Sequence, residues 1–103
     1  MPITEAQLAQ QVEHLLSLYN WRWTHFRPAL TLRGWRTPLS GFPGFLDYLA
    51  VRPPRLLVFE LKSEVGVASL DQVEWFTMLN ECPGVEVFLW KPWDLERIAE
   101  VLR

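Results

Sequence analysis

The sequence predicts an α/β domain in which helices flank a small mixed β-sheet, in the order αβββαβα. Stretches with apolar residues at helical spacing, two of them opened by capping boxes, alternate with short runs rich in strand-forming residues. A chain of 103 residues that is 50% hydrophobic is long enough for one core, so residues 1–103 are expected to form a single domain.

The first half of the chain predicts one helix and three strands. Thr4 to Gln7 has the form of a capping box, and residues 5–19 follow with apolar side chains at helical spacing. Residues 21–26 alternate bulky and polar side chains like a strand, and residues 33–44 are rich in glycine and proline like a loop. Residues 45–51 and 56–61 are nearly continuous apolar runs, which suggests strands covered on both faces.

The second half of the chain adds a helix, a strand and a final helix. Ser69 to Gln72 is a second capping box, and the helix that it opens is expected to reach about residue 81. Its apolar positions should cover the sheet: Val73, Phe76, Leu79 and Trp75. Pro83-Gly84 ends this helix, residues 85–90 read as a strand, and Asp94 is expected to cap a last helix through residue 102.

The two central strands place two acids opposite each other. If residues 47–51 and 56–62 pair as a hairpin closed by residues 52–55, Asp47 faces Glu60 with Cβ atoms roughly 4.5–5.5 Å apart. Lys62 then lies on the same face as Glu60. Facing carboxylates in an apolar hairpin are unfavourable unless a cation or a proton neutralises them, so the spacing predicts a divalent metal site. The alternative is a structural ion pair of Asp47 or Glu60 with Lys62.

The net charge of −2 hides an uneven distribution. Residues 21–55 carry six arginines against the single acid Asp47, interleaved with aromatic side chains, whereas residues 56–103 are acidic. Such a stretch suits phosphates and stacked bases. In the alternative interpretation these arginines form a solvated edge that pairs with the acidic half of the chain.

Three segments carry a resemblance to a known family. Residues 40–66 contain Asp47, Glu60, Lys62 and Gly66; residues 69–75 contain Gln72; and residues 86–92 run from Glu86 to Pro92. With these features the chain resembles the VRR-NUC (virus-type replication-repair nuclease) family of the PD-(D/E)XK nuclease superfamily over essentially its whole length. The resemblance implies a restriction-endonuclease-like core. In the position before Asp47 this family usually has proline, and this chain has Leu46.

The resemblance assigns catalytic positions residue by residue. Asp47 matches the motif aspartate, and Glu60 and Lys62 match the Glu-x-Lys pair. Glu5 matches the glutamate of the first helix, and Gln72 the glutamine of the helix after the hairpin. Glu5 also suits the helix dipole, and Gln72 also suits its capping box, so both residues have a structural alternative.

Such a site would hold Mg²⁺ or Mn²⁺ between oxygen ligands. The expected ligands are Asp47, Glu60, the backbone carbonyl of Leu61 and, directly or through water, Glu5. Lys62 would orient the attacking water or neutralise the transition state. The expected DNA contacts are Arg27, Arg33, Arg36, Trp35 by stacking, and His25, although a lone histidine on a strand is more often a surface residue.

The expected function is a metal-dependent DNA endonuclease. The resemblance implies action on four-way (Holliday) or other branched DNA in viral, including bacteriophage, replication or repair, by stand-alone dimers. A homodimer interface is expected among Trp21, Trp23, Trp35 and Trp93, because six tryptophans are more than one small core needs. The alternatives are a less selective nuclease or nickase, and a nucleic-acid-binding module that has lost cleavage.

The expected compartment is the cytoplasm, that of the host if the protein is viral. The single Cys82 offers no internal disulfide, and no second cysteine or histidine cluster offers a zinc site. Residues 1–13 do not read as a signal peptide, and no apolar run approaches the length that spans a bilayer, so no membrane partner is expected.

Overall fold

A four-stranded mixed sheet forms the centre of the protein, in a computed structural model that describes residues 3–26, 29–31, 34–36 and 39–103. In order across the sheet, the strands are β1 (Arg22–His25), β4 (Tyr48–Arg52), β5 (Arg55–Leu61) and β6 (Val85–Trp90). Neighbouring strands run antiparallel from β1 to β5, and β6 runs parallel to β5. The α/β class and the mixed sheet predicted from the sequence are confirmed.

Helix α1 (Glu5–Leu18) begins at the predicted capping box. The side chain of Thr4 accepts a hydrogen bond from the N–H of Gln7 at 3.1 Å, and the N–H of Thr4 donates to the Gln7 side chain at 2.8 Å. The chain turns after the helix at Asn20, whose φ of 64° lies in the left-handed region that asparagine tolerates. The fully buried side chains of α1 lie on one face: Leu8, Val12 and Leu16.

Strands β4 and β5 form the expected hairpin in the expected register. Val51 pairs with Leu56, as predicted, and Arg52 also pairs with Arg55, so the connecting loop has two residues instead of four. The pairing continues without a bulge as far as Tyr48. The preceding position in the chain, Asp47, therefore lies just before the start of β4.

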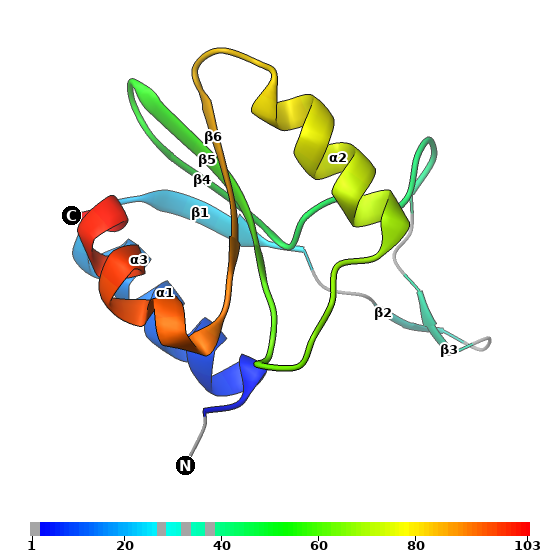
Figure 1. Ribbon diagram of the computed structural model, residues 1–103, viewed down its shortest axis with the longest axis horizontal. Coiled ribbons are helices and arrows are strands. Elements are labelled where there is room, and N and C mark those ends of the chain that lie inside the picture. The colour runs from blue at the N-terminus through cyan, green and yellow to red at the C-terminus, as the bar shows by residue number, and fades with distance from the viewer. Residues whose placement is uncertain (1–2, 27–28, 32–33, 37–38) are drawn as a thin grey trace.

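The helices cover both faces of the sheet (Figure 1). Helices α1 and α3 (Leu95–Leu102) pack on one face, over a core that includes Tyr48, Phe59 and Trp90. Helix α2 (Leu70–Asn80) lies on the other face, over a smaller core around Val58. Because successive side chains of a strand point to opposite faces, Glu60 follows Val58 onto the α2 face.

Helix α2 covers its face of the sheet incompletely. It begins at the predicted second capping box at Ser69. None of its residues is fully buried, and Val73, which was expected to cover the sheet, is 47% exposed. Only part of its apolar surface, at Phe76 and Leu79, packs against the sheet core. The expectation that these apolar positions cover the sheet therefore holds for Phe76 and Leu79 and is wrong for Val73.

Two short strands depart from the predicted order. Strands β2 (Ala29–Thr31) and β3 (Gly34–Arg36) form a separate two-stranded sheet where the sequence predicted a loop from residue 33. The order αβββαβα omits this hairpin. Strands of three residues are too short to show alternation, and the neighbouring glycines and prolines favoured a loop.

The last helix starts differently from the prediction. A 3₁₀ turn, η1 (Pro92–Asp94), precedes α3. Asp94 occupies the N-cap position of α3 but makes no side-chain capping bond there. Its carboxylate accepts instead from the N–H of Lys91 at 2.8 Å, which closes the 3₁₀ turn.

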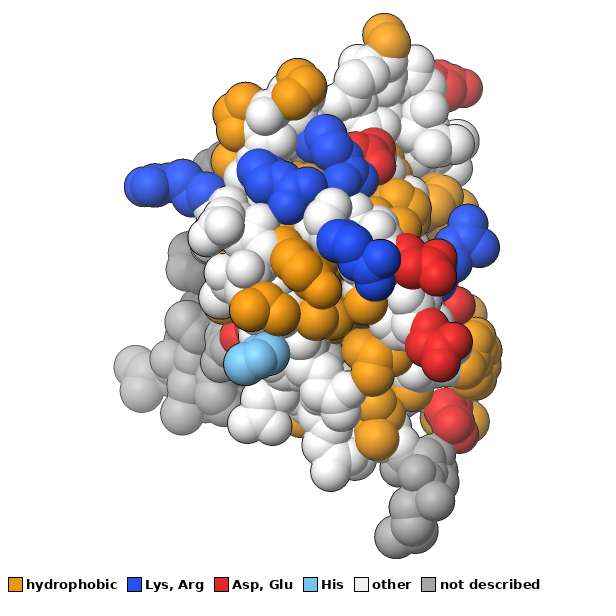
Figure 2. All heavy atoms as spheres, turned by 90° about the vertical axis from the view of Figure 1, so that its left-hand side faces the viewer, with side chains coloured by type: hydrophobic (Ala, Val, Ile, Leu, Met, Phe, Trp, Pro, Cys, Tyr) orange, Lys and Arg blue, Asp and Glu red, His pale blue; other side chains and the backbone are white. Residues whose placement is uncertain are grey.

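Two arginines of the basic stretch hold the C-terminal helix. Arg55 binds both carboxylate oxygens of Glu86 at 2.8 Å, and Arg52 donates to the carbonyl of Tyr19 at 2.9 Å. Both also donate to backbone carbonyls at the end of α3, and both lie over the ring of Trp21. Figure 2 shows Lys and Arg side chains gathered on the face that carries the C-terminus. Arg55 therefore pairs with an acid of the second half, as the alternative interpretation of the basic stretch expects, whereas Arg52 binds backbone carbonyls.

No helix within the described part of the chain is both long enough and apolar enough to cross a bilayer.

Candidate active site

Asp47 and Glu60 meet at the end of the β4–β5 hairpin. The carboxylate of Glu60, which is 2% exposed, accepts a hydrogen bond from the backbone N–H of Asp47 at 3.0 Å. On the other side of β4, the carbonyl of Asp47 accepts from the N–H of Phe26 at 2.7 Å, which extends the pairing with β1. Backbone hydrogen bonding therefore fixes the position of Asp47 on both sides.

Lys62 joins the two acids, as the sequence predicted. Its ammonium lies 3.2 Å from the second carboxylate oxygen of Glu60. The N–H of Lys62 donates to the carbonyl of Trp90 at 3.0 Å, so its backbone continues the parallel pairing of β5 with β6. Its side chain is 17% exposed, whereas that of Glu60 is 3% exposed. Lys62 is thus the more accessible member of the pair.

The environment raises the pKa of Asp47 to about 7. Burial is the largest cause, because it disfavours the charged form. The charge of Glu60 and its hydrogen bond to Asp47 raise this pKa further, the charge of Glu5 adds to the effect, and Lys62 opposes it. The site is therefore a carboxylate pair that binds a proton near neutral pH when no cation is present.

A second lysine, for which no sequence pattern predicted a role, holds the turn that follows Lys62. Lys91 donates to the carbonyls of Glu64 and Gly66 at 3.0 and 2.7 Å. A Cβ at Gly66 would lie 3.2 Å from the Cβ of Lys62 and from the hydroxyl of Ser63, so glycine suits this close turn. Lys91 thereby fixes the backbone that leads away from Lys62. A lysine before a proline carries no pattern that would have revealed this contact.

Glu5 and Gln72 differ in their relation to the two acids. Glu5, in the first turn of α1, lies near enough to Asp47 for its charge to raise that pKa. The side-chain oxygen of Gln72 accepts from the N–H of Ser69 at 3.0 Å, so it serves the capping box. Gln72 also lines an apolar hollow of about 210 Å³ with Leu46, the residue before Asp47. Catalytic roles for Glu5 and Gln72 stay predictions.

Most of the expected DNA-contacting side chains lie outside the part of the chain that the structure describes. Arg27 and Arg33 lie outside the described residues, and Trp35 and Arg36 have a described backbone, in β3, but no described side chain. His25 ends β1, and its Nδ1 lies 3.4 Å from a carboxylate oxygen of Glu13 in α1. A contact between His25 and a phosphate stays a prediction.

A cluster of polar and aromatic side chains on the α1 face of the sheet was not predicted from the sequence. The ring of His25 stacks on Tyr48 at 4.1 Å, and Tyr48 stacks on Phe59 at 4.8 Å, so three neighbouring strands each contribute one ring. The hydroxyl of Tyr48 donates to the same oxygen of Glu13 that His25 approaches. Tyr48 is fully buried, and its hydroxyl ties α1 to the strand that leads from Asp47. Only the tertiary position of Glu13 reveals this bond.

The expected tryptophan patch is wrong at Trp21. This residue is 4% exposed, and its indole N–H donates to the carbonyl of Leu102 at 2.8 Å. Trp23 is half-buried and donates to the hydroxyl of Ser17, whereas Trp93 is 65% exposed. The side chain of Trp35 lies outside the described residues. Trp21 therefore belongs to the core and cannot form a dimer surface.

The site offers oxygen ligands without a complete metal cage. Among the described residues, no group of three or more His, Cys, Asp and Glu side chains is placed to hold a metal ion. Asp47 and Glu60 supply two carboxylates, and Leu61, whose carbonyl was the expected third ligand, is the last residue of β5. Mg²⁺ is often bound by one or two carboxylates and keeps several waters, so this donor set fits such an ion.

Comparisons with known proteins add no relative to this description. No protein-family model matches the chain, and searches of curated proteins and of solved structures found no match.

Proposed function

We propose that this chain is a metal-dependent DNA endonuclease with a restriction-endonuclease-like core of the VRR-NUC type. One observation carries the proposal: the carboxylates of Asp47 and Glu60 meet at the end of a buried hairpin, and Lys62 contacts Glu60 at 3.2 Å. Two acids with an adjacent lysine suit phosphodiester hydrolysis, because they can hold a divalent cation beside a partly exposed positive charge.

Mg²⁺ or Mn²⁺ would be held by Asp47, Glu60 and the carbonyl of Leu61, with Glu5 directly or through water. The raised pKa of Asp47 supports this assignment, because a cation relieves the repulsion that otherwise makes the pair bind a proton. When bound, such a cation supplies an activated water and neutralises charge on phosphate oxygens.

Lys62 acts on the phosphate or on the attacking water. Its ammonium is anchored by Glu60 and is partly exposed, so it can reach a bound substrate without leaving its partner. Its positive charge is worth most in the transition state, where charge develops on the phosphoryl oxygens. Glu60 thus orients Lys62 in addition to holding the cation.

The substrate we propose is four-way or otherwise branched DNA, cut during viral replication or repair in the cytoplasm of the cell or host. The resemblance of residues 40–66 to the VRR-NUC pattern supports this substrate and the accompanying homodimer. A less selective nuclease or nickase would use the same Asp47 site with a broader substrate range.

A nucleic-acid-binding module without cleavage is the second candidate. It is favoured by the finding that the described residues contain no group of three or more acidic, histidine or cysteine side chains placed to hold a metal. In that case the contact between Lys62 and Glu60 is a structural ion pair. All three motif positions are nevertheless present, and a protein that has lost cleavage usually lacks one of them.

The test is cleavage of a labelled DNA panel that contains a four-way junction, a flap and a linear duplex. Wild-type protein should cut the junction in Mg²⁺ or Mn²⁺ and not in EDTA. Glu60→Gln should abolish cutting, whereas Glu64→Gln, a change at an exposed glutamate four positions away, should leave it intact. Binding of every DNA without cutting of any would support the binding module and reject the nuclease.

A further inference from the structure

A pocket of about 390 Å³ lies between the loop that precedes Asp47 and the outer face of α2. Its volume is within the range of small-molecule sites. The residues that shape it come from both elements: Phe42 from the loop, and Asp71, Glu74, Trp75, Met78 and Leu79 from α2.

The walls of this pocket are held in place. The indole N–H of Trp75 donates to the carbonyl of Pro43 at 2.9 Å, and the ring of Phe45 meets Trp75 edge to face at 5.0 Å. Gly44, with a φ of +82°, lies so close to α2 that a Cβ would come within 2.4 Å of the Cβ of Asp71. The loop and the helix therefore form one unit, and the pocket is preformed.

One short segment of chain connects the pocket to the Asp47 site. Gly44, which contacts α2, is separated from Asp47 by two residues, so one short segment carries both features. Phe42, in the same loop, is 85% exposed and borders the pocket, so its ring is accessible to a bound strand. The loop after Lys62 also carries exposed apolar side chains, Val65 and Val67, which are 88% and 84% exposed.

The lining favours a nucleobase over a phosphate. Phe42 and Trp75 supply aromatic walls, Asp71 and Glu74 supply carboxylates, and none of the described residues that line the pocket is a lysine or arginine. Carboxylates repel phosphate but accept hydrogen bonds from the exocyclic amino groups of bases, and aromatic walls stack on base faces. A base that remains paired within a duplex cannot enter such a pocket.

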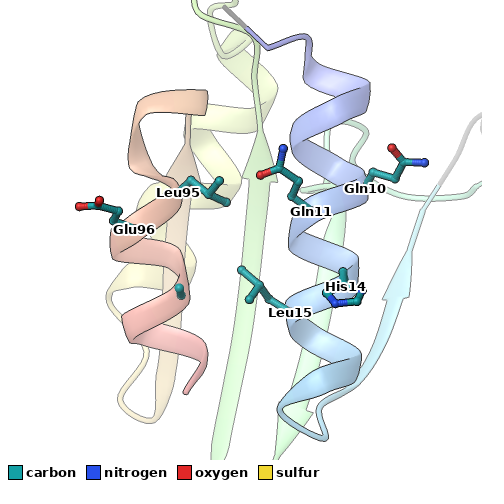
Figure 3. A pocket seen from close by; sticks show the side chains of 7 residues that line it. Gln10, Gln11, His14, Leu15, Leu95 and Glu96 are labelled. Atoms are coloured by element: carbon teal, nitrogen blue, oxygen red, sulfur yellow. The ribbon is translucent and has the colours of Figure 1, made fainter.

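A groove elsewhere on the molecule lacks these features. It lies between α1 and α3, on the opposite side of the sheet from α2, and its labelled side chains are two glutamines, two leucines, a histidine and a glutamate (Figure 3). It has no aromatic wall beyond His14, and no residue that lines it belongs to the loops around Asp47. Position and lining both single out the pocket at Phe42.

We propose that the pocket between Phe42 and Trp75 binds an unpaired nucleobase of the DNA strand that is held at Asp47 and Glu60. The inference rests on the proposed nuclease function and narrows its substrate class to DNA with at least one unpaired nucleotide near the cut. A second copy of the chain could also pack against these apolar walls. A base is favoured because the loop that forms the pocket leads directly to Asp47.

The test measures binding in EDTA, where no cutting occurs, by fluorescence anisotropy of three labelled DNA duplexes. One duplex is fully paired, one carries a single bulged deoxycytidine, and one carries an abasic bulge. Wild-type protein should bind the deoxycytidine bulge about tenfold more tightly than the abasic bulge, as stacking of one base predicts. Phe42→Ala should abolish this difference, and Leu18→Ala, a change at a 58% exposed residue of α1, should preserve it.

Equal binding of the deoxycytidine and abasic bulges by wild-type protein would overturn the inference. So would a Phe42→Ala variant that keeps the wild-type preference, or one whose only defect is a fall from dimer to monomer in light scattering. The assay is independent of cleavage. A Phe42-dependent base preference without cutting in Mn²⁺ would keep the pocket and reject the nuclease, and the reverse result would keep the nuclease and reject the pocket.

Discussion

Glu60 accepts a hydrogen bond from the backbone N–H of Asp47 at 3.0 Å, across thirteen positions of sequence. This bond fixes the buried carboxylate of Glu60 beside Asp47. The charge of Glu60 in turn disfavours the ionised form of the Asp47 carboxyl. The hairpin therefore stores an unfavourable contact that a proton or a cation relieves.

The first prediction is a loss of stability as the pH rises. The folded-state pKa of Asp47, about 7, exceeds its ordinary value of 3.8, so its contribution is fully present below about pH 4 and is lost as the pH passes 7. Without metal, the free energy of unfolding of the wild type should fall relative to Asp47→Asn by on the order of 1–2 kcal/mol between pH 4.5 and 8, allowing for partial solvent screening.

Chemical denaturation at a series of pH values measures this difference. Glu64→Gln, a change at an exposed acid of the neighbouring loop, is the control and should track the wild type. Parallel curves for the wild type and Asp47→Asn across the whole pH range would contradict the raised pKa.

A second prediction separates catalysis from binding at Lys62. Lys62→Ala should lower the single-turnover cleavage rate by about a hundredfold or more, because its charge acts in the transition state. Its affinity for the same DNA in EDTA should stay within a few fold of wild type. A variant that cuts at the wild-type rate would show that Lys62 is only the ion-pair partner of Glu60.

A third prediction concerns the hydroxyl of Tyr48. Tyr48→Phe removes its bond to Glu13 and should cost about 1–3 kcal/mol of stability, as expected for a buried hydrogen bond to a charged group. Tyr19→Phe is the matched control, because at Tyr19 it is the backbone carbonyl that binds Arg52. Equal melting temperatures for the two variants would mean that the Tyr48 hydroxyl contributes nothing.

A fourth prediction is assembly into a two-fold dimer. A four-way junction presents two related strands, and a domain of this size offers one site, so two copies are the simplest way to cut both. Light scattering should give a mass near twice 12.1 kDa, and a cruciform plasmid should be cut on both strands in one encounter. A monomer that nicks linear duplex as readily as a junction would contradict this assembly.

Local sequence patterns predicted the hairpin and its acids well. Antiparallel pairing has a fixed register, so the short loop between β4 and β5 was enough to place Asp47 opposite Glu60. The capping boxes at Thr4 and Ser69 are equally local, and both begin helices as predicted.

Tertiary contacts explain what the sequence could not provide. Trp21 is buried in the core, bonded to the carbonyl of Leu102 and covered by Arg52, and no local pattern reports these contacts. The pocket at Phe42 likewise depends on Trp75 reaching the carbonyl of Pro43 across 32 positions. Features of this kind require the packed fold, whereas register and capping do not.

Calorimetric titration of Mn²⁺ into metal-free protein at pH 7 tests the central claim most directly. Wild-type protein should bind Mn²⁺ and release a fraction of a proton, because the pKa of Asp47 is raised to about 7, so the heat should change with the ionisation enthalpy of the buffer. Glu60→Gln should lose this binding, and Glu64→Gln should keep it. No binding by the wild type, or equal binding by Glu60→Gln, would contradict a metal site at Asp47 and Glu60.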